Sequence, residues 1–219
     1  KSLRVFAHDF GYPGLAGPDK IGFHGPWEAM RILGTVPVEP DGSALFRVPA
    51  NTPLAVQALD AGGQAVQLMR NWFTAMPGEK VSCVGCHETR SVAPLEKQTW
   101  NTLALAREPS VPVPPPWGDR PVSFLRDIQP ILDQHCVRCH RGLKPAGGID
   151  LGGGLISYDG EVAHYGHNRA FETILEKQLV SLSPARAQDA SITPPMAYGV
   201  HNSKLIATLS DKDHIDDVK

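Results

Sequence analysis

The sequence has no apolar run long enough to cross a bilayer, few aromatic residues and almost no net charge. Phe, Trp and Tyr make up 7% of its 219 residues, whereas Gly occurs 21 times and Pro 20 times. We therefore expect many turns, and a core filled partly by something other than side chains. The net charge of −2 excludes the basic surface with which proteins attract nucleic acids. We expect neither a nucleic-acid partner nor a transmembrane segment.

Cysteine is also scarce, but its placement is informative. All four cysteines lie in two Cys-x-x-Cys-His motifs, at residues 83–87 and 136–140. In this motif the two thiols add to the vinyl groups of a haem, and the adjacent imidazole ligates the iron. A single helical turn brings both sulfurs and the ring to one porphyrin edge. The motifs therefore predict two covalently bound haem c groups, held by Cys83, Cys86, His87, Cys136, Cys139 and His140.

Three other uses of paired cysteines fit the sequence less well. Zinc ribbons have about 15–20 residues between their pairs, far fewer than separate Cys86 from Cys139, and they do not need a histidine after both pairs. A disulfide framework is possible in an exported protein, but it would not explain why His87 and His140 follow the two cysteine pairs. A thioredoxin-like site uses one pair in a β–α–β unit, whereas this chain has two pairs.

The pattern along the chain predicts an α+β fold in three parts: a β-rich haem c domain of residues 1–107, a Pro-rich linker of residues 108–121, and a helical, cytochrome c-like domain of residues 122–219. The linker favours polyproline II, and its alternative role is a strap across one continuous domain. In the first part, alternating residues and tight turns predict strands at 35–39, 44–48, 54–59 and 64–70. They would form a small antiparallel sheet or sandwich that carries the first haem. Residues 28–33 also fit a helix.

The helical part has the layout of a small cytochrome c that carries the second haem. A helix that begins near Asp127 would hold Pro130 in its first turn and run directly into Cys136. Apolar residues at helical spacing predict a second helix over 168–182, and a last helix covers 203–210.

Each haem iron needs a second axial ligand unless it is left open for chemistry. For the second haem, residues 193–201 offer both Met196 and His201, and the residues alone do not separate the two. Methionine would raise the reduction potential and histidine would lower it. For the first haem the candidates precede the motif without a diagnostic spacing, and we take His24 from a set that also includes His8, Met69 and Met76.

Several stretches resemble the middle domain of hydrazine synthase alpha-subunit-like proteins, namely residues 34–44, 48–54, 57–60, 67–70, 77–79 and 82–88. Residues 128–133 and 199–205 continue this resemblance, which covers nearly the whole chain. Such dihaem c-type cytochromes are common in planctomycete-type bacteria, often after a β-propeller.

The resemblance implies a haem in the middle domain, which is catalytic in hydrazine synthase, and a bis-histidine electron-transfer haem in the C-terminal domain. It favours His201 over Met196 as the sixth ligand of the second haem, with His214 third. Hydrazine synthase has a tyrosine shortly after its first attachment histidine. Here residues 88–91 are Glu-Thr-Arg-Ser, and the next tyrosine is Tyr158. The resemblance therefore implies the haem framework rather than hydrazine chemistry.

From these features we expect single-electron transfer between redox proteins, or between subunits of a larger multi-haem complex. The alternatives are a haem enzyme whose first iron is five-coordinate and acts on a small nitrogen or oxygen species, and a structural module docked on other subunits. No signal peptide is visible, and residues 1–6 resemble the interior of a polypeptide. We expect a mature or excised fragment located in the periplasm or otherwise outside the cytoplasmic membrane.

Overall fold

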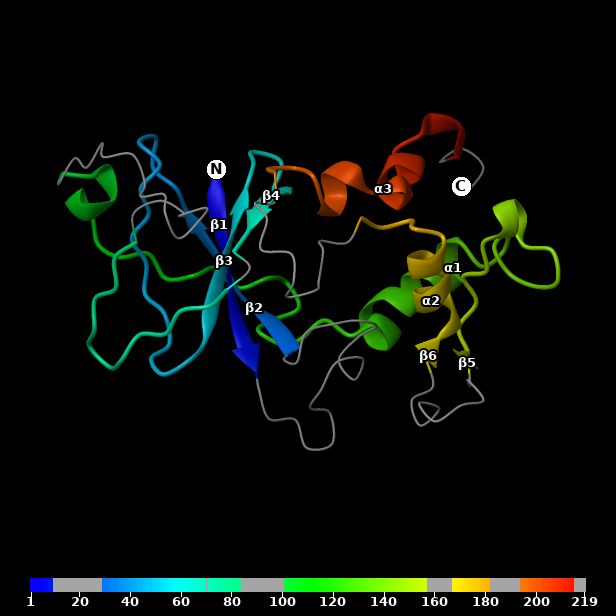
Figure 1. The fold of residues 1–219 in the computed structure, drawn as a ribbon, viewed down its shortest axis with the longest axis horizontal. Coiled ribbons are helices and arrows are strands. Elements are labelled where there is room, and N and C mark those ends of the chain that lie inside the picture. The colour runs from blue at the N-terminus through cyan, green and yellow to red at the C-terminus, as the bar shows by residue number, and fades with distance from the viewer. Residues whose placement is uncertain (10–28, 70, 84–100, 157–166, 182–193, 215–219) are drawn as a thin grey trace. The chain divides into compact units, whose positions relative to one another are not determined.

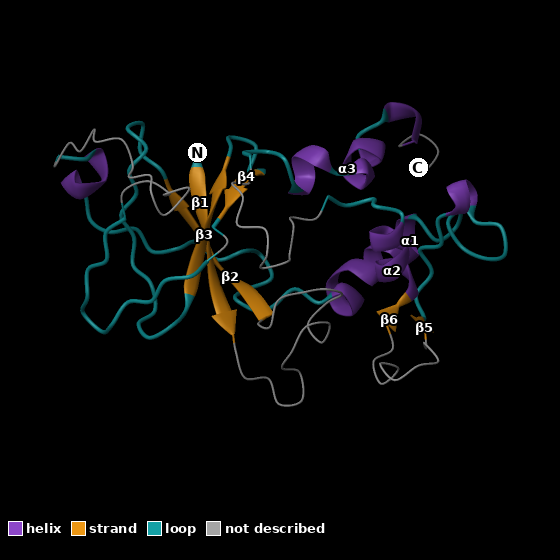
Figure 2. Cartoon of the chain, viewed as in Figure 1, coloured by secondary structure: helices purple, strands orange, loops and turns teal. Residues whose placement is uncertain are grey.

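The computed structural model of the chain describes residues 1–9, 29–69, 71–83, 101–156, 167–181 and 194–214. The chain forms two compact units, seen in Figures 1 and 2. The sheet unit consists of residues 1–121 and 184–197, and the helical unit consists of residues 122–183 and 198–219. The fold is therefore α+β, with a small antiparallel sheet and few helices. Within the described ranges, every helix is too short or too polar to traverse a bilayer.

The sheet has four antiparallel strands in the order β2-β1-β3-β4. Their bounds are Ser2–Asp9 for β1, Ala29–Pro37 for β2, Leu54–Leu59 for β3 and Ala65–Leu68 for β4. Because β1 pairs with a strand on each side, its middle is the most buried part of the sheet. The core consists of Val5 and Ala7 with Val36 and Leu54, all of them at most 1% exposed.

Three strand predictions agree with the structure, two of them in part, and two segments differ. The strand predicted at 54–59 is confirmed as β3, β4 lies inside the range predicted at 64–70, and residues 35–37 of the strand predicted at 35–39 form the end of β2. The helix considered for 28–33 is wrong, because residues 29–33 belong to β2 and pair with β1. The strand predicted at 44–48 is also wrong, since Phe46 forms only an isolated bridge, with Ser110. The prediction omitted β1, whose buried run of residues 5–8 lacks the alternation of a half-exposed strand.

The Pro-rich segment lies in the sheet unit and covers the outer edge of β2. Val113 N–H donates to the Thr35 carbonyl, and Thr35 N–H donates to the Val113 carbonyl, both at 2.9 Å. A further bridge joins Arg31 to Pro121. Proline has no N–H, so Val113 supplies the donor that its proline neighbours lack. Residues 110–121 thus form a strap that satisfies an otherwise open strand edge.

Gly34 is the position where this strap comes closest to β2. Its φ is +151°, and a Cβ built there would lie 2.4 Å from the Val113 carbonyl oxygen. A side chain at this position would therefore push the strap away from the strand.

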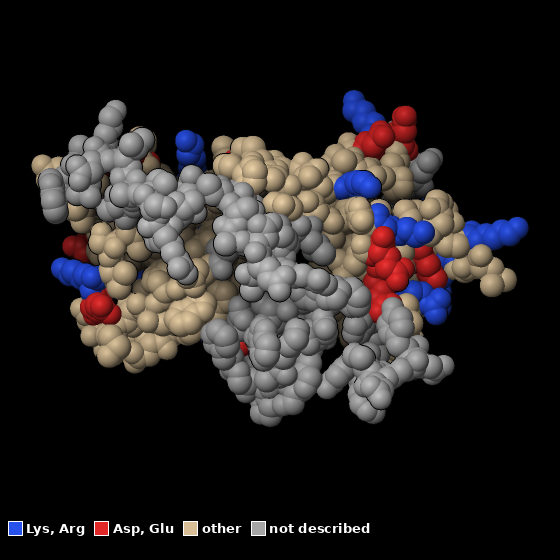
Figure 3. Space-filling model, viewed as in Figure 1, with Lys and Arg blue, Asp and Glu red and all other residues tan. Residues whose placement is uncertain are grey.

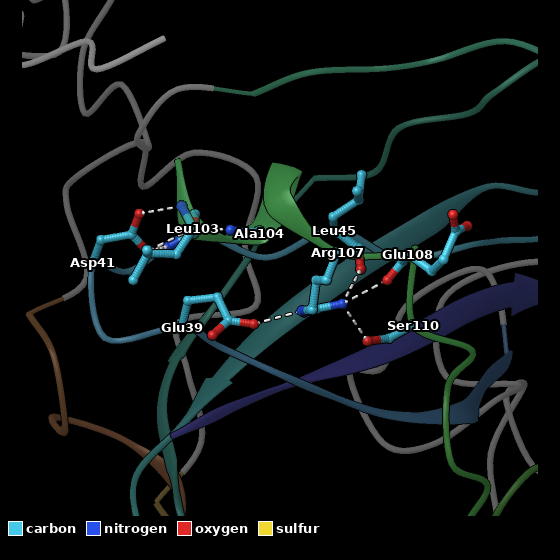
Figure 4. A network of polar contacts seen from close by, with 9 residues as sticks. Glu39, Asp41, Leu45, Leu103, Ala104, Arg107, Glu108 and Ser110 are labelled. Atoms are coloured by element: carbon cyan, nitrogen blue, oxygen red, sulfur yellow. Dashed lines mark hydrogen bonds and ion pairs between the residues drawn. The ribbon is translucent and has the colours of Figure 1, made fainter. Parts of the chain in front are cut away.

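Arg107 ties the start of the strap to the loop after β2, as Figure 4 shows. Its Nε donates to Glu39 Oε1 at 2.5 Å, and its Nη1 donates to Ser110 Oγ at 2.8 Å and to the Leu45 carbonyl at 3.3 Å. One guanidinium therefore links two segments that are distant in sequence, residues 39–45 and 107–110, with charge-assisted bonds that are stronger than neutral ones.

Asp41 forms a second link in the same region (Figure 4). It accepts a 2.6 Å bond from the Ser43 hydroxyl and a 2.8 Å bond from the Leu103 N–H, which begins the short helix η1 (Leu103–Ala106). Hydrogen bonds from the Ser43 side chain, and then from the Leu103 backbone, lower the pKa of this carboxyl.

The helical unit contains short elements around a small core. They are η2 (Phe124–Ile128), α1 (Gln129–His135), η3 (Ala146–Gly148), β5 (Leu155–Ile156), β6 (His167–Asn168), α2 (Arg169–Glu176), η4 (Gly199–Asn202) and α3 (Lys204–Leu209). The core brings together Leu132 of α1, Leu151, and Ala170 and Ile174 of α2.

The helix predictions are largely confirmed, with one helix shorter than expected. Pro130 lies in the first turn of α1, and Ser203 caps α3 by accepting from the Ile206 N–H. Asn168 caps α2, but the helix ends at Glu176 rather than near residue 182. Gln178 adopts a φ of +51°, which is incompatible with a continuing helix.

The chain contacts the sheet unit again near its end. Met196 N–H donates to the Val66 carbonyl of β4 at 2.8 Å. The described residues 194–197 therefore group with the sheet, although residues on both sides belong to the helical unit.

We expect Gly34→Ala to lower the free energy of unfolding by about 2 kcal/mol, because the new methyl group collides with the strap backbone. Gly42→Ala is the matched control: its φ is +87° but no atom lies within 4 Å of the built Cβ, so only backbone strain of about 1 kcal/mol is added. Urea denaturation followed by tryptophan fluorescence measures both. Equal losses for the two variants would contradict the close approach.

Candidate haem site

The second attachment motif begins where α1 ends. Leu132 packs into the core of the helical unit, and the Cys136 N–H donates to its carbonyl at 2.8 Å as the C-cap of the helix. The amphipathic helix therefore fixes the first cysteine through a buried residue one turn earlier.

Residues 136–140 continue as a single tight turn. The Cys136 carbonyl accepts from Cys139 N–H at 3.1 Å and from His140 N–H at 2.9 Å. These two bonds hold both thiols and the imidazole on one turn. This is the arrangement that attachment to a porphyrin edge through two thioethers and one iron ligand requires.

The ring of His140 is oriented by the loop that follows. Its Nδ1 lies 3.1 Å from the Ala146 carbonyl oxygen. A carbonyl can only accept, so Nδ1 carries the proton and Nε2 keeps its lone pair for a metal. Two backbone bonds hold the loop in place, from Ala146 N–H to the Cys139 carbonyl at 3.0 Å and from Leu151 N–H to the His140 carbonyl at 2.7 Å.

The two thiols have different surroundings. Cys136 is half-buried, and burial raises the pKa of its thiol, whereas Cys139 is exposed. Before attachment Cys136 is therefore held as the neutral thiol near pH 7.

A second imidazole lies beside His140. The rings of His140 and His214 have centroids 6.2 Å apart, with planes inclined by 47°. A metal–imidazole bond is about 2 Å long, and the ring centroid lies roughly 1 Å beyond the nitrogen, so two imidazoles on opposite sides of one iron have centroids about 6 Å apart. The observed separation matches that arrangement.

The short helices of the helical unit leave several apolar side chains exposed. α3 has no buried residue, and its Ile206 and Leu209 are 37% and 43% exposed. Ile131 of α1 and Leu125 of η2 are 55% and 58% exposed. Exposed apolar side chains are the kind of surface that a porphyrin could cover. The residues of the helical unit therefore fit a haem.

Two other candidates for the sixth ligand of the second haem are also described. His201 is exposed in η4. Met196 groups with the sheet unit through its backbone bond to β4. The family resemblance placed His214 third, and 73 residues separate it from His140, so no local signal in the sequence links the two.

The first attachment motif is only partly described. Cys83 is exposed at the end of a described stretch, whereas Cys86, His87 and His24 lie outside the described residues. Three further candidates for its sixth ligand are placed in the sheet unit: His8 is buried in β1, Met69 is half-buried after β4, and Met76 is 64% exposed.

A site for a bare metal ion is not evident in the described part of the chain, where no three His, Cys, Asp or Glu side chains gather as ligands. The candidate site is therefore the turn of residues 136–140 together with His214.

Comparison with known proteins identifies related chains. The family model described as the hydrazine synthase alpha subunit middle domain matches residues 4–88. Hydrazine synthase subunit alpha of Kuenenia stuttgartiensis is 28% identical over 198 residues, which cover 67% of this chain and 24% of that protein. The structure of Kuenenia stuttgartiensis hydrazine synthase shares the fold, with a TM-score of 0.63 and 23% identity over 95% of this chain and 33% of that one.

The chain therefore spans between a quarter and a third of the length of these relatives. The resemblance to hydrazine synthase alpha-subunit-like proteins drawn from the sequence is therefore confirmed: residues 4–88 are similar to the middle domain of that subunit, and the fold is similar over 95% of the chain.

Proposed function

We propose that this chain is a dihaem c-type cytochrome module that passes single electrons within a hydrazine synthase-like complex or between redox proteins. The observation that carries the proposal is the turn of residues 136–140 with His214 beside it. The turn has the bonds that a haem attachment motif requires, and the ring separation of 6.2 Å suits two imidazoles on one iron.

Each residue of the second site has a separate task. Cys136 and Cys139 would each add S–H across a vinyl C=C bond and so hold the ring by two thioethers. The Ala146 carbonyl keeps the proton on Nδ1 of His140, so that the lone pair of Nε2 would be available to an iron. His214 would supply the opposite ligand. Bound between two imidazoles, haem supplies reversible one-electron chemistry at a relatively low potential.

The first site is proposed on the motif alone, with Cys83 and Cys86 as attachment residues, His87 as proximal ligand and His24 as the candidate opposite ligand. The relative from Kuenenia stuttgartiensis is a subunit of hydrazine synthase, so the alternative is an enzyme whose first iron is five-coordinate. That iron would act on a small nitrogen or oxygen species and draw electrons from the second.

The proposed partners follow from the length of the relatives. Because the chain spans only part of them, we propose that other domains or subunits receive or supply its electrons. Covalent haem c also supports a location outside the cytoplasmic membrane, in the periplasm.

We expect the purified protein to carry two covalent haems, seen as two haem mass increments on the denatured chain and a matching pyridine haemochrome absorbance. Cys136→Ser/Cys139→Ser should remove one increment and Cys83→Ser/Cys86→Ser the other, since each pair supplies the two thioethers of one haem. A wild-type chain without a mass increment would contradict the proposal at both sites.

We expect His214→Ala to convert the second haem from low-spin to high-spin ferric iron, since it removes one of two strong-field ligands. Electron paramagnetic resonance at low temperature measures this change, and added imidazole should restore the low-spin signal. His201→Ala is the comparison variant, because His201 was favoured by the family resemblance.

His135→Ala is a second control at an exposed position next to the motif and should leave both spectra unchanged. A high-spin signal from His201→Ala, with none from His214→Ala, would overturn the ligand choice. A high-spin signal from the first haem of the wild-type protein would favour the enzyme alternative.

A further inference from the structure

The loop after the second attachment motif is closed on the motif itself. Ala146 N–H donates to the Cys139 carbonyl at 3.0 Å, and the Ala146 carbonyl engages His140 Nδ1 at 3.1 Å. Both ends of residues 140–146 are therefore held at the attachment turn. The loop therefore begins and ends next to Cys139, which is exposed.

The attachment turn and this loop together carry three basic side chains and one large apolar side chain. Arg138, Arg141 and Lys144 are exposed, and Leu143 is fully exposed at 104%. We call these four residues the attachment-loop surface. Figure 3 shows Lys and Arg atoms where this loop projects beyond α1 in Figure 1. A large apolar side chain held fully in water costs free energy unless a partner covers it.

The local charge is opposite to that of the whole chain. No acidic residue occurs between Asp133 and Asp150, although the complete sequence has a net charge of −2. Asp133 accepts from Gln129 Nε2 at 2.8 Å, and Asp150 pairs with Arg169 at 3.4 Å. The acids that flank the loop in sequence are therefore engaged by residues of their own unit.

Next to His214 in the sequence the exposed residues alternate in sign, with Lys212 between Asp211 and Asp213. The attachment-loop surface is the part of the described site that offers three cations and an apolar residue together.

We infer that the attachment-loop surface is the docking site of an acidic redox protein that exchanges electrons with the second haem; this inference rests on the proposed function. Carboxylates of the partner face Arg138, Arg141 and Lys144, and an apolar residue of the partner covers Leu143. Complementary charge raises the encounter rate, while the small apolar contact allows rapid release, as electron transfer between proteins requires.

The test uses the haem-loaded protein with two redox probes of opposite charge. A reduced plant-type ferredoxin is the acidic protein probe: one electron leaves its iron–sulfur cluster and converts ferric to ferrous haem. Tris(phenanthroline)cobalt(III) is the cationic probe: one electron leaves ferrous haem and gives cobalt(II). No bond to the protein forms or breaks in either reaction. Stopped-flow absorbance follows both at low and high salt.

We expect Arg138→Glu/Lys144→Glu to slow the ferredoxin reaction on the order of tenfold at low ionic strength and to speed the cobalt reaction. Lys144→Glu alone should give a smaller change in the same directions. The differences should shrink at about 0.5 M salt, because screening weakens attraction between exposed charges. Leu143→Ser should slow the ferredoxin reaction at every salt concentration.

Lys177→Glu is the matched control for Lys144→Glu, because it makes the same charge change at another exposed position of the helical unit. Lys177 follows α2, whereas Lys144 follows the second attachment motif. Lys177→Glu should change both rates less than twofold. Equal effects of Lys177→Glu and Lys144→Glu would overturn the inference. A second outcome would also overturn the inference: loop variants that no longer bind phosphatidylserine vesicles but keep the wild-type ferredoxin rate. The loop would then contact membranes instead of a redox protein.

The pyridine haemochrome absorbance of every variant separates a failure of the proposed function from a failure of the docking site. Absence of the second haem from the wild-type protein would contradict the proposed function itself. A second haem that is present in all variants, with ferredoxin rates unchanged by the charge reversals, would contradict only the docking site.

Discussion

The carbonyl oxygen of Cys136 accepts hydrogen bonds from both Cys139 and His140, and these bonds close one turn at the end of α1. The rest of the second site depends on this turn. The cysteine spacing has chemical meaning only when the backbone is held in this conformation. α1 provides that support, because Leu132 is buried in the core and its carbonyl accepts from the first residue of the turn. The loop then returns to the same point, and Ala146 orients the imidazole.

The sheet unit depends on a different kind of constraint, the covering of a strand edge. The outer edge of β2 is satisfied by the strap of residues 110–121, and the strap approaches so closely that only glycine fits at Gly34. Arg107 adds charge-assisted bonds where the strap begins. Together these contacts make the Pro-rich segment part of the unit that contains Cys83.

Local patterns predicted some elements well because their signals are local. β3 follows from alternation between two turns, and α1 follows from Pro130 in its first turn and an apolar face. Other elements depend on partners distant in sequence. Residues 29–33 suit a helix by composition, but β1 offers them a complete ladder. The segment at 44–48 alternates like a strand, yet only Ser110 pairs with it, so it remains a single bridge.

For the candidate sites, the sequence by itself determined the two attachment motifs, since thioether chemistry fixes the identity and spacing of residues within five positions. It also indicated the resemblance to hydrazine synthase alpha-subunit-like proteins, because the matching segments are long and specific in the first half of the chain. Only the tertiary structure decided which imidazole approaches His140, because His201 and His214 both lie far along the chain and neither carries a local signal. The tertiary structure also decided where the basic loop lies, because the hydrogen bond from Ala146 to the Cys139 carbonyl closes this loop on the attachment turn.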